Sequence, residues 1–127
     1  FLSNLRRYRE LEITKKSKCI ITSNIPSDNV YLQTTYKDLL NTDEVVKDNA
    51  GLMAVKFLMD YGVKEVYLAG YDGYSHDDSK NYSDIKMTLI TKNAILDAMN
   101  IGMNRILQEY SNTIKILFLT KPRYIVI

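Results

Sequence analysis

Two side chains with acid–base chemistry follow a short apolar run in the segment KEVYLAGYDGYSHDDSKNY. Asp72 comes just after the run, where its carboxylate could accept hydrogen bonds from sugar hydroxyls or hold a metal-bound water. His76 is the only histidine of the chain. Either side chain is a candidate general base that would deprotonate an acceptor hydroxyl. The sequence places no serine or cysteine nucleophile with His76, so no covalent mechanism is predicted.

Glycines and tyrosines surround Asp72 and give the segment a second possible use. Gly70 and Gly73 permit tight backbone turns and the close approach of a ligand. Tyr74, like Tyr71 and Tyr82, offers an aromatic face for stacking and a phenol donor. We therefore expect ligand contacts at Gly70, Asp72, Gly73 and Tyr74. The alternative is that Asp72-Gly73 is an ordinary turn and the tyrosines pack the rim of a sheet.

The sequence SHDD within the same segment is reminiscent of a metal site. His76, Asp77 and Asp78 are consecutive, however, and neighbours in sequence rarely converge on one ion without ligands from elsewhere. No second histidine is available to help them. We therefore predict a solvated loop and no metal site.

A possible anion site lies at the start of a predicted helix, in the sequence DNAGLM. The chain has neither GxGxxG nor GxxxxGK[ST], the two strongest phosphate signatures. A helix start still presents free N–H groups and a positive dipole end, and we place Asn49 and Gly51 there as candidate phosphate or carboxylate contacts. A plain N-cap with a small residue for helix packing is the alternative. Ser23 and Asn24, which end another apolar run, could face the same crevice or simply begin a loop.

The elements that would position these residues alternate along the chain. Apolar spacing predicts helices over 2–12, from a cap at Asp48 or Asn49 to Gly62, and from 87 or 91 to Tyr110. β-Branched and aromatic runs predict strands over Cys19–Asn24, Val30–Tyr36, Glu65–Gly70 and Thr113–Thr120, with an edge strand over 121–127. A polar loop is expected at about 75–84. Strands that alternate with helices predict a Rossmann-like α/β fold, a mainly parallel sheet with helices on both faces.

Composition fits one globular domain over residues 1–127. Apolar residues make up 46% and charged residues 25%, and the net charge of +2 is too even to indicate a nucleic-acid partner or an anionic membrane. No apolar stretch approaches the roughly 20 residues that cross a bilayer. The lone Cys19 cannot form an internal disulfide, which favours a reducing, cytoplasmic setting. The chain begins at Phe1 without an obvious opening strand, so we expect it to be a segment of a longer protein.

Three motifs carry a family resemblance: DNAGLM, LAGYDGYS and FLT. With the long asparagine-dotted helix between the last two, they resemble the C-terminal domain of bacterial aldolases related to hydroxymethylglutaryl-CoA lyase and 4-hydroxy-2-oxovalerate aldolase. The resemblance runs from Cys19 to Tyr124. It is weaker toward the Rossmann-like domains of hydroxymethylpterin diphosphokinase-like and sialyltransferase-like proteins. The ending FLTKPRY departs from the family pattern, in which proline follows the threonine directly.

The resemblance implies a surface-polysaccharide context and an upstream aldolase barrel in the same chain. The aldol chemistry and its divalent metal would belong to that barrel, and no cofactor is expected in this domain. No catalytic residue carries over from the family. The positions that match its motifs are candidate ligand contacts only: Asn49, Gly51, Gly70, Asp72, Gly73 and Tyr74.

Three functions are consistent with the sequence. The leading one is an accessory domain of an aldolase-like enzyme that binds a nucleotide, a nucleotide sugar or a sugar phosphate. The second is a glycosyl- or diphosphotransferase with Asp72 or His76 as the base. The third is a structural domain that packs on the barrel or forms a homodimer.

Overall fold

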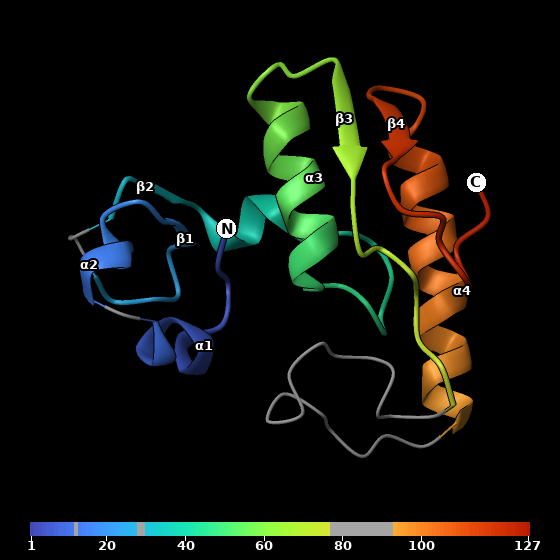
Figure 1. Ribbon diagram of the computed structural model, residues 1–127, viewed down its shortest axis with the longest axis horizontal. Coiled ribbons are helices and arrows are strands. Elements are labelled where there is room, and N and C mark those ends of the chain that lie inside the picture. The colour runs from blue at the N-terminus through green and yellow to red at the C-terminus, as the bar shows by residue number, and fades with distance from the viewer. Residues whose placement is uncertain (12, 28–29, 77–92) are drawn as a thin grey trace.

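The computed structural model describes residues 1–11, 13–27, 30–76 and 93–127. Within these ranges the chain is a mixed α/β protein with short parallel strands (Figure 1). The helices are α1 (Leu5–Glu10), α2 (Ile13–Lys16), α3 (Ala50–Asp60), α4 (Asn93–Tyr110) and the 3-10 helix η1 (Tyr36–Leu39). The strands are β1 (Ile20–Thr22), β2 (Leu32–Thr34), β3 (Glu65–Leu68) and β4 (Lys115–Phe118).

The strands form two small sheets among the described residues, where we had expected one. β1 pairs with β2, β3 pairs with β4, and both pairs are parallel, as predicted. Leu2 adds a single parallel bridge to Ile21. Because Leu2 is bound in this way, α1 begins only at Leu5, where Asn4 caps it, and the helix predicted over 2–12 is shorter than expected.

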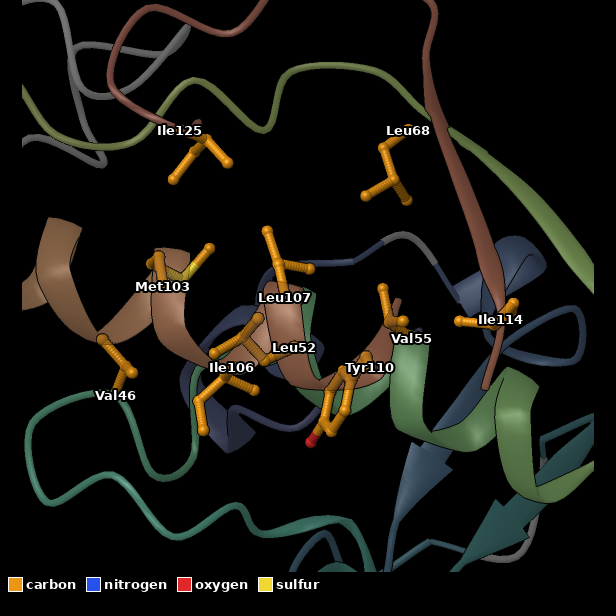
Figure 2. Close-up of a cluster of buried hydrophobic side chains, with 10 residues drawn as sticks. All are labelled: Val46, Leu52, Val55, Leu68, Met103, Ile106, Leu107, Tyr110, Ile114 and Ile125. Atoms are coloured by element: carbon orange, nitrogen blue, oxygen red, sulfur yellow. The ribbon is translucent and has the colours of Figure 1, made fainter. Parts of the chain in front are cut away.

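One face of the β3–β4 sheet is buried, because side chains alternate along each strand. Leu68 is 4% exposed, whereas Tyr67 is 55% exposed on the opposite face. The predicted cover of helices on both faces of the sheet is therefore not confirmed at Tyr67. Figure 2 shows the buried cluster on the inner side of the sheet, to which α3 and α4 contribute most of the side chains.

Helix α3 begins and ends where the sequence predicted. The Asn49 side chain accepts a hydrogen bond from the Leu52 N–H at 3.1 Å, so Asn49, and not Asp48, is the N-cap. At the other end Gly62 has φ of 91°, and its N–H donates to the Met59 carbonyl. The Val63 N–H donates to Leu58, which completes the usual left-handed helix stop.

A second, smaller cluster lies between α1 and β1 and contains Tyr8, Ile21 and Ile25. Cys19 is half-buried against it. In Figure 1 these N-terminal elements lie to the left of α3, and β3, β4 and α4 lie to its right. No helix within the described ranges is long and apolar enough to cross a membrane.

The edge strand predicted over 121–127 does not form. The segment's polar backbone groups find partners outside a strand ladder: the Tyr124 N–H donates to the Asp72 carbonyl at 2.8 Å. The Asn104 side chain donates to the Tyr124 carbonyl at 3.0 Å and accepts from the Val126 N–H. These contacts tie the end of the chain to α4. The predicted start of α4, at 87 or 91, lies outside the described residues.

Candidate functional site

A cavity of about 240 Å³ lies where the first turn of α3 meets the loop that follows β3. The carboxyl ends of parallel strands and the amino ends of adjacent helices commonly converge at one edge of an α/β fold. The two segments here are about twenty residues apart in sequence, and the sheet brings them together. The cavity is lined by Asn49, Ala50, Gly51, Gly70, Tyr71, Asp72, Gly73, Tyr74 and Met103.

Asn49 connects the two sides of this cavity. Its Oδ1 caps α3, as described above, and its Nδ2 donates to the Tyr74 hydroxyl at 3.0 Å. Both polar atoms of the amide are therefore used, one within the helix and one across the cavity. The amide orientation is fixed by these two contacts.

The first turn of α3 leaves backbone donors at the cavity. The cap satisfies the Leu52 N–H, whereas the N–H groups of Ala50 and Gly51 have no hydrogen-bond partner among the described residues. The Tyr71 hydroxyl donates to the Gly51 carbonyl at 2.9 Å, and a Cβ at Gly51 would lie 3.0 Å from the Tyr71 ring. Only glycine lets the ring approach this closely. Burial raises the pKa of Tyr71, so its hydroxyl stays protonated at neutral pH.

The glycines after β3 turn the chain into the cavity. Gly70 has φ of 76° and Gly73 has φ of 84°, a region that favours glycine. No atom of the described residues lies within 4 Å of a Cβ at Gly70. A Cβ at Gly73 would lie 2.7 Å from Asn100 Oδ1 and 2.8 Å from Tyr124 Cβ. Gly73 therefore permits a close approach to α4 as well as the turn.

Asp72 has a positive neighbour. Its carboxylate lies 3.7 Å from the Arg123 guanidinium, and its side chain is 32% exposed. Its own carbonyl accepts the Tyr124 N–H, which holds the backbone at this point. The guanidinium and the backbone contact therefore both hold Asp72 at the edge of the cavity.

A second cavity of about 320 Å³ adjoins the first, with Tyr74 in the lining of both. His76 Nε2 lies 2.7 Å from Asp97 Oδ1 in this second cavity. Its other lining residues are Ser75, Asn100 and Tyr124. Thus His76 does not line the cavity that contains Asp72, but lies next to it.

Helix α4 holds the loop through side chains that sequence reasoning did not single out. Asn100 Oδ1 accepts the Tyr74 N–H at 2.6 Å, and Asn100 Nδ2 donates to the Tyr74 carbonyl at 2.8 Å. Asp97 and Asn104 lie three residues before and four residues after Asn100, which places all three on one helix face. The helical spacing of these three polar residues was the sequence signal that could have revealed their contact with the loop.

The structure brings together six of the predicted contacts and separates two. Asn49, Gly51, Gly70, Asp72, Gly73 and Tyr74 line the first cavity. Ser23 and Asn24 line neither cavity, because they follow β1, which belongs to the other sheet. Ser23 Oγ accepts the Tyr36 N–H at 2.9 Å, and Asn24 Nδ2 donates to the Ser3 carbonyl at 2.9 Å. Both side chains therefore stabilise loops, and the expectation that they share the crevice is wrong.

Three other residues that the sequence analysis named, Asp77, Asp78 and Tyr82, lie outside the described residues. Within the ranges that the structure describes, no three His, Cys, Asp or Glu side chains gather so that they could hold a metal ion.

Comparisons of the chain with protein-family models, with curated proteins and with solved structures find no match.

Proposed function

We propose that this protein binds a small phosphorylated molecule, either a sugar phosphate or the phosphate end of a nucleotide or nucleotide sugar. The observation that carries the proposal is the cavity at the first turn of α3, closed on its other side by Gly70–Tyr74. Ala50 and Gly51 of that turn line it, and their backbone N–H groups have no partner among the described residues.

An anion is the ligand that such a turn favours. The N–H groups and the positive end of the helix dipole both attract negative charge. Gly51 adds no side chain that would keep a phosphoryl oxygen away from the backbone. The cavity volume of about 240 Å³ lies below the roughly 300–1,000 Å³ of pockets for drug-sized ligands. A phosphoryl group with part of a sugar fits this size, and a whole nucleotide sugar would extend beyond it.

The wider role that we propose is that of an accessory domain in an aldolase-like enzyme of carbohydrate metabolism. Support comes from the resemblance of DNAGLM and LAGYDGYS to such domains, and from the position of both motifs at the cavity. In this view the two sheets belong to one larger Rossmann-like arrangement, and an upstream barrel supplies the metal and the aldol chemistry. Among the described residues, no lysine that could form a Schiff base lines either cavity.

Titration of the protein with inorganic phosphate, a hexose phosphate, a nucleoside monophosphate and CMP- or UDP-sugars, followed by calorimetry, tests the proposal. We expect saturable binding of at least one phosphorylated compound and none of the matching unphosphorylated sugar. A protein that binds none of them at millimolar concentration would rule the proposal out.

Ala50→Asp provides a sharper test at the helix start. An aspartate in the first turn is favourable for a helix, so the fold should be retained, but its charge repels an anion. We expect phosphate affinity to fall at least tenfold. Ala50→Asn is the matched control, since it has nearly the same shape without the charge, and it should bind within about threefold of the wild type.

A further inference from the structure

We infer that the cavity formed by His76 and Asp97 is the hydroxyl-binding half of the phosphate site, so that the ligand is a sugar monophosphate. This inference rests on the proposed function and narrows its ligand class. The structural basis is the position of the His76–Asp97 pair next to the first cavity, with Tyr74 shared between the two linings.

The two cavities have a fixed relative position because Tyr74 is held at both ends. Its hydroxyl accepts a hydrogen bond from Asn49, the cap of α3. Its backbone N–H and carbonyl are both bound by the Asn100 amide of α4. A ligand that extends from the α3 turn past Tyr74 therefore meets the second cavity in a defined geometry.

The second cavity offers hydrogen-bond acceptors. Asp97 Oδ1 lies 2.7 Å from His76 Nε2, and His76 Nδ1 takes no part in this contact. The second Asp97 oxygen is an acceptor. The Asn100 amide uses its oxygen and one N–H on Tyr74, and its second N–H remains as a donor at the edge of this cavity. Sugar hydroxyls donate to such acceptors. Asp97, unlike Asp72, has no arginine or lysine partner among the described residues that would offset its repulsion of a second phosphate.

Accessibility is consistent with a ligand contact. The side chains of His76 and Asp97 are 53% and 60% exposed, so each presents surface that a ligand can contact. The other charged pair near the cavities, Asp72 with Arg123, lies on the first cavity's side of Tyr74. An exposed ion pair contributes little to stability, and removal of His76 or Asp97 should therefore leave the fold intact.

The experiment compares inorganic phosphate with a hexose monophosphate in calorimetric titrations of the wild type, His76→Ala and Asp97→Ala. A lost hydrogen bond to a ligand weakens binding by roughly three- to tenfold, and one to a charged group by more. We expect that loss for the hexose monophosphate in both variants and unchanged binding of inorganic phosphate. Asp60→Ala, which breaks an exposed ion pair of α3 with Lys56, is the matched control and should bind both compounds as the wild type does.

The possible failures are distinguishable. If phosphate and hexose monophosphate bind the wild type but neither variant weakens the hexose compound, the inference is wrong and the proposed function stands. The inference is also overturned if a hexose bisphosphate or a nucleoside monophosphate binds more tightly than the hexose monophosphate. If no phosphorylated compound binds at all, the proposed function and the inference fail together.

Discussion

The side-chain amide of Asn49 donates a hydrogen bond to the Tyr74 hydroxyl at 3.0 Å while its oxygen caps α3. One residue therefore fixes the start of a helix and the loop that follows a distant strand. The two roles depend on different atoms of the amide, so they can be separated by mutation.

A double-mutant cycle should separate them. Tyr74→Phe removes only the hydroxyl, and we expect a loss of about 1 kcal/mol in the free energy of unfolding. Asn49→Ala removes the cap as well, which adds about 1 kcal/mol. Both changes break the same bond. The loss of stability in the double variant should therefore be about 1 kcal/mol smaller than the sum of the losses in the two single variants. Urea denaturation measures all four proteins, and strictly additive losses would contradict the bond.

Gly73 should be much less tolerant of a side chain than Gly62. Both have positive φ, so alanine costs about 1–2 kcal/mol at either position. At Gly62 no atom of the part of the chain that the structure describes lies within 4 Å of the new Cβ, whereas at Gly73 the Cβ would lie 2.7 Å from Asn100 Oδ1. Overpacking adds roughly 1–3 kcal/mol there.

Gly62→Ala is thus the matched control for backbone strain in this comparison. Thermal denaturation should show a clearly lower melting temperature for Gly73→Ala than for Gly62→Ala. Equal losses in the two variants would mean that the contact between the loop and α4 is not close.

Sequence reasoning located the first cavity because general rules place both of its sides. Asn49 followed from N-cap chemistry, and Gly70 and Gly73 followed from the need for turns after an apolar strand. That these segments meet follows from the parallel arrangement, in which strand ends and helix starts converge at one edge. Nothing in this reasoning required knowledge of which residues are in contact.

Other features depended on contacts that no local pattern contains. Ser23 and Asn24 also follow a strand, but β1 belongs to the other sheet. The apolar end of the segment 121–127 predicts an edge strand. The strand does not form because the backbone of this segment pairs with Asn104 and the Asp72 carbonyl, which are distant in sequence. The exposure of Tyr67 could have been suspected, since Glu65 precedes it by two residues and so shares its face of the strand.

Asn100→Asp should test whether α4 holds the loop. The carboxylate can still accept the Tyr74 N–H, but its second oxygen replaces the donor that faces the Tyr74 carbonyl at 2.8 Å. The loss of this hydrogen bond, together with repulsion between the new carboxylate and the Tyr74 carbonyl, should lower the free energy of unfolding by roughly 2 kcal/mol. Asn112→Asp, an exposed position after α4, is the control and should change stability by about 0.5 kcal/mol or less. Similar effects of the two substitutions in urea denaturation would show that the Asn100 amide is not a clamp.

Tyr110 gives the protein a specific sensitivity to alkaline pH. Its hydroxyl is buried without a hydrogen-bond partner among the described residues. Burial, with the nearby charges of Glu109 and Asp60, raises the pKa of Tyr110 from its ordinary value of 10.0 to about 12. The folded state therefore keeps the proton longer than the unfolded state does, and stability is lost as pH rises from about 10 toward 12. The loss is on the order of 2 kcal/mol.

Tyr110→Phe should remove that loss and, because no bond is given up, raise stability at neutral pH by about 1 kcal/mol. Tyr8→Phe is the matched control, since the Tyr8 hydroxyl lies 2.7 Å from Ser27 Oγ and its removal should lower stability. Urea denaturation at pH 8 and at pH 11 measures both effects. A Tyr110→Phe variant that is less stable than the wild type at pH 8, or that loses as much stability between the two pH values, would show that the hydroxyl has a partner in the folded protein.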